Sequence, residues 1–452
     1  MQIQFLGAAG TVTGSKYLLT TSSSKIFVDC GLFQGYKPLR LKNWEDLPFN
    51  PATLDAVVLT HAHLDHSGYL PSLIKQGFRG KIYCTEATYD LCKILLPDSG
   101  HLQEEDADYA NRHGFSKHHP ALPLYTEEDA IRALKFFSPV KFNTPFKPAK
   151  ELTVEFSPAG HLLGAAIVSI TDGDKTITFS GDLGRLNDPI MVAPALIKKT
   201  DYLVLESTYG NRKHDPANPT ELLGKTIRDT VNRGGVVVIP SFAVGRAQLL
   251  MHYIHLLKQA GEIPPLLPVY LNSPMARDAT VLYNKHHHEH RLTAAQTQEM
   301  CHAAKIINSV EESKALNFQR MPMVIIAASG MATGGRVLHH LKTFASDPRN
   351  TILFAGYQAG GTRGASMLAG AESIKIHGQY VPLRAQVVQI DNLSAHADYE
   401  EILSWLSHFE AAPKMTFLTH GELEAADALR KRIEETMGWN VNIPSHGDKI
   451  TL

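Results

Sequence analysis

Short apolar runs, each ended by Gly, Asp, Pro or a polar cluster, recur through the first 208 residues. They are "MQIQFLGA", "SKYLLTT", "KIFVDCG", "DAVVLTHAH", "KIYCT", "LTVEFSPAGH", "AAIVSIT", "KTITFSGD" and "DYLVLES". Runs of this length with these boundaries are typical of β-strands. Between them, residues 86–137 place apolar side chains at helical spacing, as in "TEEDAIRALKFF". The first part of the chain is therefore predicted to be mostly strands, with helices over 86–137.

A different pattern occupies residues 209–376. An apolar strand, a Pro/Gly turn and an amphipathic helix follow one another in "GGVVVIPSFAVGRAQLLMHYIHLLK", again in "PVYLNSPMARDATVLYNKH", and again in "PMVIIAASGMATGGRVLHHLKTF". Repeated strand–loop–helix order predicts a parallel α/β domain. Ligands in such sheets bind at the carboxyl ends of the strands.

After residue 377 the first pattern returns, with the strands "AQVVQID" and "KMTFLTHGE" on either side of the helix "YEEILSWLSHF". The strands "VVLTHAH" and "TFLTHGE" both end in Leu-Thr-His followed by a small residue. We therefore expect residues 1–208 and 377–452 to be two matching parts of one sandwich domain, with the α/β domain of residues 209–376 inserted between them.

Composition excludes several classes of protein. Hydrophobic residues make up 44% of the 452 residues without a long apolar run, which excludes a transmembrane helix. The N-terminus lacks the basic and apolar regions of a signal peptide, so a cytoplasmic location is expected. The net charge of −1 argues against a generally basic nucleic-acid coat, but it leaves room for a local basic cleft.

Cysteine and histidine are distributed differently. The four cysteines (Cys30, Cys84, Cys92 and Cys301) show no CxxC spacing and are expected to be buried thiols in a reducing compartment. Many of the 23 histidines lie beside Asp, Gly or Thr at the ends of apolar runs. The cluster "KHHHEH" at residues 285–290 follows a helical pattern and is expected to be a solvated face.

The stretch "VVLTHAHLDHSGYLP" has the spacing of a metal site. His61 and His63, two residues apart just past a strand end, can converge on one ion, and Asp65 and His66 then point to a neighbouring position. Zinc takes imidazole and carboxylate ligands, usually four in number. The stretch therefore offers two ligands to each of two ions.

Further ligands must come from other strand ends. His161 lies in "SPAGHLLGA", Asp182 in "TFSGDLG" and His420 in "FLTHGE". A carboxylate such as Asp182 can bridge two ions about 3.5–4 Å apart. Each of these residues, taken singly, could equally be a hydrogen-bonded turn residue.

These residues, with "VDCG" upstream, resemble the metallo-β-lactamase fold, an αββα sandwich with a two-metal hydrolytic site. The resemblance implies a first zinc on His61, His63 and His161, a second on Asp65, His66 and His420, and Asp182 as the bridge. It also implies that Asp29 orients a ligand histidine or the loop backbone. Di-iron flavoprotein relatives carry Glu at the position of His63, so the imidazole favours zinc hydrolysis.

The resemblance extends to the β-CASP subfamily, which cuts nucleic acids. Glu206 in "DYLVLESTYG", His396 in "LSAHAD" and His420 match its motifs A, B and C. The match continues through "PSFAVGRAQ", "LNSPMA", "ASGMATGGRVLHHLK" and "GYQAGGTRG" and covers the chain in order. The chain is similar to short bacterial and archaeal β-CASP ribonucleases, which resemble the catalytic core of the eukaryotic pre-mRNA 3′-end endonuclease. No KH-type extension and no large C-terminal domain is expected.

The motifs suggest roles for the remaining polar residues. His396 is the candidate general acid for the leaving alcohol, because imidazole titrates near neutral pH. Glu206 would hydrogen-bond it, although the two could also form a structural ion pair. Four residues of the inserted domain are candidate phosphate or RNA contacts, with packing of Gly-rich turns as the alternative: Ser329, Arg336, Arg363 and Arg246.

The sequence thus predicts an enzyme with two zinc ions that hydrolyses single-stranded RNA, most simply as an endonuclease. The residues expected in catalysis are Asp182, Glu206 and His396. A small-molecule thioester or lactam hydrolase, a 5′→3′ exonuclease, a DNA nuclease and a non-catalytic scaffold remain alternatives. Neither a membrane partner nor an organic cofactor is expected, and the protein would be a monomer or homodimer.

Overall fold

The computed structural model describes residues 1–114, 116–273 and 275–452. These residues form two compact units. One unit contains Met1–Lys213 and His396–Leu452, and the other contains His214–Ala395. The chain therefore leaves the first unit once and returns to it, as an inserted domain requires.

The first unit contains two seven-stranded sheets. The first sheet has the order β22 (Lys449–Thr451), β1 (Gln2–Phe5), β2 (Tyr17–Thr20), β3 (Lys25–Val28), β4 (Ala56–Val58), β5 (Lys81–Thr85), β6 (Phe137–Val140). The second has the order β21 (Val441–Asn442), β20 (Met415–Thr419), β11 (Tyr202–Glu206), β10 (Lys175–Phe179), β9 (Ala166–Asp172), β8 (Leu152–Pro158), β7 (Phe146–Ala149). Every strand predicted before residue 208 is present. The sequence pattern did not reveal β6 and β7.

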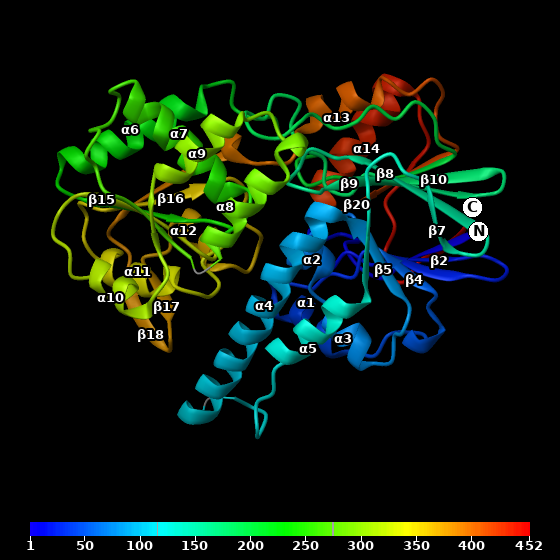
Figure 1. The fold of residues 1–452 in the computed structure, drawn as a ribbon, viewed down its shortest axis with the longest axis horizontal. Helices are drawn as coiled ribbons and strands as arrows, with labels where there is room; N and C mark the ends of the chain where they lie inside the picture. The colour runs from blue at the N-terminus through cyan, green and yellow to red at the C-terminus, as the bar shows by residue number, and fades with distance from the viewer. Residues whose placement is uncertain (115, 274) are drawn as a thin grey trace. The chain divides into compact units, whose positions relative to one another are not determined.

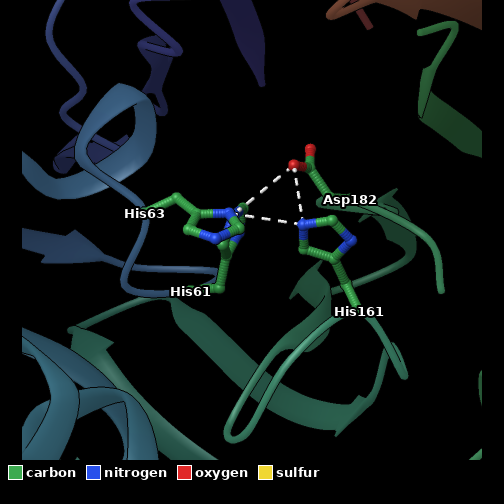
Figure 2. A group of neighbouring side chains, drawn as sticks. All are labelled: His61, His63, His161 and Asp182. Atoms are coloured by element: carbon green, nitrogen blue, oxygen red, sulfur yellow. Dashed lines mark hydrogen bonds and ion pairs between the residues drawn. The ribbon is translucent and has the colours of Figure 1, made fainter. Parts of the chain in front are cut away.

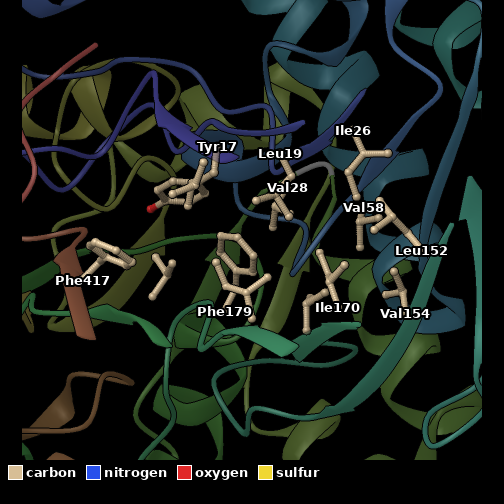
Figure 3. Close-up of a cluster of buried hydrophobic side chains, with 14 of the residues drawn as sticks. Tyr17, Leu19, Ile26, Val28, Val58, Leu152, Val154, Ile170, Phe179 and Phe417 are labelled. Carbon is tan, nitrogen blue, oxygen red and sulfur yellow. The ribbon is translucent and has the colours of Figure 1, made fainter. Parts of the chain in front are cut away.

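The core of the first unit lies between these sheets, as Figure 3 shows. Strand β8 supplies the alternating residues Leu152, Val154 and Phe156, and all three are fully buried. Alternate side chains of a strand point to one face, so this pattern turns one face of β8 inward. Val28 and Val58, from β3 and β4, belong to the same cluster. Burying each such side chain contributes about 1.5–3 kcal/mol.

Helices flank the two sheets of the first unit (Figure 1). On the side of the first sheet are α2 (Leu64–Ser67), α3 (Leu70–Lys75), α4 (Glu86–His113) and α5 (Glu127–Ala133), and on the side of the second are α13 (Tyr399–Leu406) and α14 (Leu423–Met437). The helices predicted over 86–137 are confirmed as α4 and α5. Thr85 caps α4 by accepting a hydrogen bond from the Thr88 amide, and the left-handed Gly114 ends it. The predicted αββα order is confirmed.

The second unit is built on a parallel sheet, as predicted. Its six strands have the order β14 (Lys305–Ile307), β13 (Val269–Asn272), β15 (Met323–Ala327), β12 (Val236–Pro240), β16 (Thr351–Ala355), β19 (Gln386–Ile390). Its helices are α6 (Pro219–Asn232), α7 (Arg246–Gln259), α8 (Ala276–Lys285), α9 (Ala294–His302), α10 (Val310–Leu316), α11 (Val337–Phe344) and α12 (Arg363–Leu368). A small hairpin, β17 (Ser373–Ile376) and β18 (Gln379–Pro382), completes it.

The chain returns to the first unit later than the sequence boundary at 376/377 suggested. Strand β19, the "QVVQI" run, pairs in parallel with β16 from Gln386 to Ile390 and therefore belongs to the inserted sheet. The first unit resumes at His396. Apolar composition identified β19 as a strand, but its pairing partner lies more than thirty residues away and leaves no local signal.

The predicted solvated face at residues 285–290 is wrong for half of the cluster. His286, Glu289 and His290 are buried, at 3%, 8% and 6% exposure, while His287 and His288 are exposed. A short 3₁₀ turn over His287–Glu289 replaces the helical spacing assumed from the sequence.

The structure agrees with the expectation of buried thiols for three of the four cysteines, since Cys301 is only partly buried. All four cysteines are free thiols, and Cys30, Cys84 and Cys92 are buried. Among the described residues, no helix combines the length and the apolarity that crossing a membrane requires.

Candidate active site

The site is built on the loop that follows β4. Buried Leu59 and Ala62 fix this loop against the core, and Ser67 in α2 donates its hydroxyl to the Ala62 carbonyl at 2.8 Å. The loop therefore turns sharply after the strand. His61 and His63 lie before the turn, and Asp65 and His66 lie on the first turn of α2.

A first group of donor atoms gathers at the ends of three strands (Figure 2). His61 and His63 follow β4, His161 follows β8 and Asp182 follows β10. His63 Nδ1 lies 3.1 Å from His61 Nε2 and 3.3 Å from His161 Nε2. Asp182 Oδ2 lies 3.4 Å from His61 Nε2 and 3.5 Å from His161 Nε2. Residues distant in sequence thus present four donor atoms to one point.

A second group lies on the other side of Asp182. Asp65 Oδ2 is 3.3 Å from His420 Nε2 and 3.9 Å from His66 Nε2. The other carboxylate oxygen of Asp182, Oδ1, is 3.3 Å from His66 Nε2 and 3.5 Å from His420 Nδ1. Asp182 therefore faces one donor group with each oxygen, which is the placement that a bridging ligand needs.

The donor spacing fits ions of the size of zinc. Four ligands placed about 2.0–2.1 Å from a central ion in a tetrahedron lie about 3.3–3.4 Å from one another. The donor separations of the first group, 3.1–3.5 Å, agree with this spacing. Asp182 Oδ1 is also buried without a hydrogen-bond partner among the described residues, although two imidazoles lie nearby. A cation would compensate this buried oxygen.

The surroundings of His61, His63 and Asp182 favour the protonation states that metal binding requires. Burial lowers the pKa of His63 to about 4, and it lowers the pKa of His61 well below its ordinary value. Burial works against the charge of Asp182, but His420 and His66 outweigh it and hold the pKa of this carboxyl well below its usual range. Neutral imidazole and ionised carboxylate are the forms that bind metal ions.

Asp29 and Thr60 fix the orientation of two of these histidines. Asp29 accepts hydrogen bonds from the Thr60 amide at 2.7 Å, the Thr60 hydroxyl at 2.9 Å and His66 Nδ1 at 2.7 Å. Because Thr60 gives its only hydroxyl proton to Asp29, its oxygen accepts from His61 Nδ1, 3.0 Å away. Both imidazoles thus keep Nε2 directed toward Asp182.

Thr208 has the same relation to His420. Its hydroxyl donates to the His420 carbonyl at 3.0 Å, and its oxygen lies 3.0 Å from His420 Nδ1. Sequence reasoning missed both Thr60 and Thr208. The only available signal was their position, since each is a threonine at a strand end beside a ligand or motif residue.

Replacing Asp29 by alanine is expected to weaken metal binding about 10–100-fold, because His66 loses the partner that fixes its ring and its tautomer. Competition with a chromophoric chelator would measure the affinity. Asp55→Ala is the matched control, since Asp55 is exposed and, within the described part of the chain, its side chain accepts a single hydrogen bond, from the Lys25 amide at 2.7 Å. Equal affinities in the two variants would contradict the role given to Asp29.

Beside the first donor group lies a paired histidine and glutamate. His396 Nδ1 donates to Glu206 Oε2 at 3.0 Å, and the Leu183 amide donates to Glu206 Oε1 at 2.6 Å. The His396 ring lies 4.5 Å from the His161 ring, measured between centroids. The Glu206 side chain is fully buried, whereas that of His396 is 17% exposed. Glu206 thus holds the ring at Nδ1 and directs Nε2 away from itself.

The surroundings of His396 favour its protonated form. Burial works against the charge, but the neighbouring Glu206 carboxylate outweighs it through its charge and its hydrogen bond, and the pKa of His396 is raised above its ordinary value. A histidine with a raised pKa remains a proton donor at neutral pH.

The four predicted phosphate contacts all lie in the second unit. Arg336 donates to the Asn272 side chain at 2.9 Å and to the Asn308 carbonyl at 2.6 Å. Arg363 donates to the Ala332 and Lys375 carbonyls, Ser329 accepts from the Thr333 amide, and Arg246 is the first residue of α7. The two arginine forks join loops of the unit. A phosphate-binding role for these residues stays a prediction.

Three family models match the chain. The Metallo-beta-lactamase superfamily model covers residues 9–217, the Beta-Casp domain model residues 247–367, and the Zn-dependent metallo-hydrolase RNA specificity domain model residues 380–444. The solved structure of a protein of unknown function from Enterococcus faecalis V583 has a TM-score of 0.53 at 17% identity, covering 100% of this chain and 99% of that one. This likeness concerns the fold alone.

Three similar proteins match all or nearly all of this chain. Ribonuclease TTHA0252 of Thermus thermophilus is 37% identical over 460 aligned positions that cover 100% of both chains. Transcription termination factor FttA of Methanosarcina mazei is 32% identical, covering 94% of this chain and 67% of that protein. The FttA of Methanocaldococcus jannaschii is 31% identical, covering 95% and 69%.

Proposed function

This chain belongs to the β-CASP family of metallo-β-lactamase-fold proteins, and on that premise we propose that it is a metal-dependent ribonuclease that cleaves single-stranded RNA internally. The full-length similarity to a protein named a ribonuclease supports RNA as the substrate, as does the match to an RNA specificity domain model. One structural observation carries the reaction class. Two donor groups share Asp182, and the His396–Glu206 pair lies directly beside them.

The donor groups would hold two zinc ions. The first ion would take His61, His63, His161 and Asp182, and the second would take Asp65, His66, His420 and Asp182. When bound, zinc at these positions supplies a water of lowered pKa and neutralises charge on the phosphate. Imidazole nitrogens dominate the first group, which favours zinc over the oxygen-preferring magnesium or calcium.

The protein's own residues would prepare the reaction. Asp29, Thr60 and Thr208 hold three ligand imidazoles in a fixed tautomer, so the site needs little rearrangement when substrate arrives. The buried carboxylate of Asp182 remains ionised between the imidazoles. Preorganised charge in a site that excludes water acts more strongly than the same charge in solvent.

His396 would donate the proton to the leaving ribose oxygen. An alkoxide is a poor leaving group, so a positioned acid contributes about 10²–10⁴-fold to the rate. Glu206 occupies Nδ1 and leaves Nε2 as the nitrogen that can deliver a proton. Its negative charge also keeps the imidazole protonated.

Glu206→Gln is expected to move the alkaline limb of the pH–rate profile to lower pH. The general acid must be protonated, and Glu206 raises the pKa of His396, so removing the charge lowers that pKa. The rate then falls earlier as pH rises. The profile of kcat/KM for RNA cleavage would show the shift. An unmoved alkaline limb with a uniformly lower rate would point to a structural ion pair instead.

A substrate panel separates this proposal from its alternatives. The purified protein would be given a 5′-labelled single-stranded RNA, the DNA of the same sequence, and a small thioester and lactam. Internal RNA fragments as first products support the endonuclease. Mononucleotides released from the 5′ end would indicate a 5′→3′ exonuclease, preferred DNA cleavage a DNA nuclease, and thioester or lactam turnover without RNA cleavage a small-molecule hydrolase. No turnover of any of them would favour a scaffold.

A further inference from the structure

The segment that follows Asp29 carries several exposed large apolar and basic side chains within nine consecutive residues, 36–44. Helix α1 (Lys37–Leu41) and the 3₁₀ turn Lys42–Trp44 carry Tyr36 at their start and Trp44 at their end. Tyr36, Leu41 and Trp44 are 55%, 50% and 58% exposed. Several large apolar side chains exposed near one another indicate an interaction surface, whereas single exposed apolar residues are normal. We call Tyr36, Lys37, Arg40, Leu41 and Trp44 the aromatic–basic platform.

The platform is held in place from beneath. The Asn43 side chain is buried, donates to the Phe33 carbonyl at 2.8 Å and accepts from the Phe33 amide at 2.9 Å. The Gln34 amide donates to the Thr13 hydroxyl at 3.2 Å. Asn43, which follows α1, is therefore hydrogen-bonded to Phe33, which precedes α1. Tyr36 and Trp44 thus project from a fixed turn, so their exposure is not that of a loose loop.

The same segment is joined to the candidate metal ligands. The Cys30 amide donates to the His66 carbonyl at 2.7 Å, and the Leu32 amide donates to the Leu64 carbonyl at 2.8 Å. A side chain at Gly31 would collide with the Asp65 carbonyl, so the two loops are in direct backbone contact. Tyr36 lies six positions after Cys30, and a chain of that length spans at most about 20 Å. The platform begins within that distance of the site.

The charge of the platform suits a polyanion. Lys37 and Arg40 are exposed, and among the described residues neither forms an ion pair with a carboxylate. Lys42 lies 5.6 Å above the Phe33 ring, beneath the platform. The exposed Glu45 and Asp46 follow Trp44, so the positive charge is concentrated on the α1 side. Exposed aromatic rings beside cations are the usual surface for single-stranded nucleic acids, where bases stack and phosphates pair with Lys and Arg.

We propose that the aromatic–basic platform binds single-stranded RNA on its way to or from the metal centre. Tyr36 and Trp44 stack on bases, Lys37 and Arg40 contact the adjoining phosphates, and Leu41 covers the apolar surface between them. This inference rests on the proposed function and adds to it a substrate-binding surface on the first unit. Stacking is tolerant of base sequence, so the platform would give an affinity that increases with the length of the RNA and depends little on its bases.

Tryptophan fluorescence can test the proposal, because Trp44 is exposed while Trp405 and Trp439 are buried at 1% and 8%. Binding of a labelled twelve-nucleotide RNA would be measured with the full chain carrying His396→Ala, so that the RNA stays intact. The RNA is expected to quench Trp44 emission.

Substitutions in the platform test the same proposal through affinity. In the His396→Ala background, Tyr36→Ala or Trp44→Ala should each weaken RNA binding about tenfold, as measured by the anisotropy of the labelled RNA. Lys37→Ala with Arg40→Ala should lower the salt dependence of binding by a slope of roughly 1 to 1.5.

Phe318→Ala is the matched control, since Phe318 is a 79% exposed aromatic residue of the second unit. Hydrolysis of bis(p-nitrophenyl) phosphate, which is too small to reach both the metal centre and the platform, reports whether the metal centre of each variant is intact.

If the wild type cleaves RNA but the platform variants bind it like Phe318→Ala, the platform proposal is overturned while the proposed function stands. If the wild type neither binds nor cleaves RNA, both fail. RNA-independent self-association that is lost in Trp44→Ala, with RNA affinity retained, would identify an interface between copies instead.

Discussion

Replacing Asp182 by alanine is expected to abolish RNA cleavage and to cost the protein at least one bound metal ion. Asp182 faces His61 and His161 with one oxygen and His66 and His420 with the other, so its loss takes a ligand from both donor groups. It also leaves several buried imidazoles without the carboxylate that balances a bound cation. The zinc content should fall from two ions per chain to one or none. The cleavage rate should fall by more than the roughly 10²–10⁴-fold that a general acid contributes.

Two further variants make this result specific. Asp182→Asn keeps the shape of the side chain and removes its charge, so a similar loss there would assign the effect to the carboxylate. Asp188→Asn is the control for a buried aspartate, because Asp188 belongs to neither donor group and accepts hydrogen bonds from the Ile190 amide at 2.8 Å and the Met191 amide at 2.7 Å. Thermal melting would confirm that each variant folds. Full zinc occupancy in folded Asp182→Ala would refute the bridging role.

Replacing His396 by alanine is expected to lower RNA cleavage by about 10²–10⁴-fold while the zinc content stays that of the wild type. His396 is held by Glu206 and lies beside His161, but it is not a member of either proposed ligand set. Measuring the zinc content therefore distinguishes a general acid from a metal ligand, which are the two roles that the position of His396 allows. Loss of zinc in His396→Ala would make His396 a ligand.

The leaving group gives a second, independent test of His396. A p-nitrophenolate departs without a proton, whereas a ribose alkoxide needs one. His396→Ala should therefore lose far less activity on bis(p-nitrophenyl) phosphate than on RNA. His408→Ala is the matched control, since His408 is an exposed histidine of the same unit, and its side chain hydrogen-bonds to the Ser404 carbonyl alone among the described residues. Equal losses on the two substrates would argue against general-acid catalysis by His396.

Local spacing made the centre of this site predictable from sequence. His61, His63, Asp65 and His66 lie within one loop and helix turn, so their spacing alone indicated that they could serve two ions. His161, Asp182 and His420 were candidates because they lie at other strand ends, and only the family resemblance assigned them as ligands. The structure brings all three to the same place. Their assignment as zinc ligands remains a proposal.

Contacts that depend on tertiary structure were not predictable. Thr60 accepts from His61 only because Asp29, from another strand end, takes its proton. In the sequence, a threonine next to a histidine does not indicate this hydrogen bond. Strand β19 gave the same apolar signal as a sandwich strand, and its parallel pairing with β16 became visible only in the fold.

The prediction of a solvated face at residues 285–290 was wrong for a related reason. Its composition is that of a solvated helix face, yet His286 and His290 are buried and His290 Nε2 hydrogen-bonds to the Tyr283 carbonyl at 2.9 Å. The chain changes from α8 to a 3₁₀ turn at this point and rotates these side chains inward. Helical periodicity is therefore a poor guide to burial across the end of a helix.

The most direct test of metal-dependent RNA cleavage is the product pattern of a 5′-labelled single-stranded RNA. The wild-type protein would be assayed as purified, after removal of metal by a chelator, and after zinc is added back. We expect internal fragments from the purified protein, intact RNA after chelation, and the same fragments again with zinc. RNA that stays intact while the protein holds two zinc ions would contradict the proposed function.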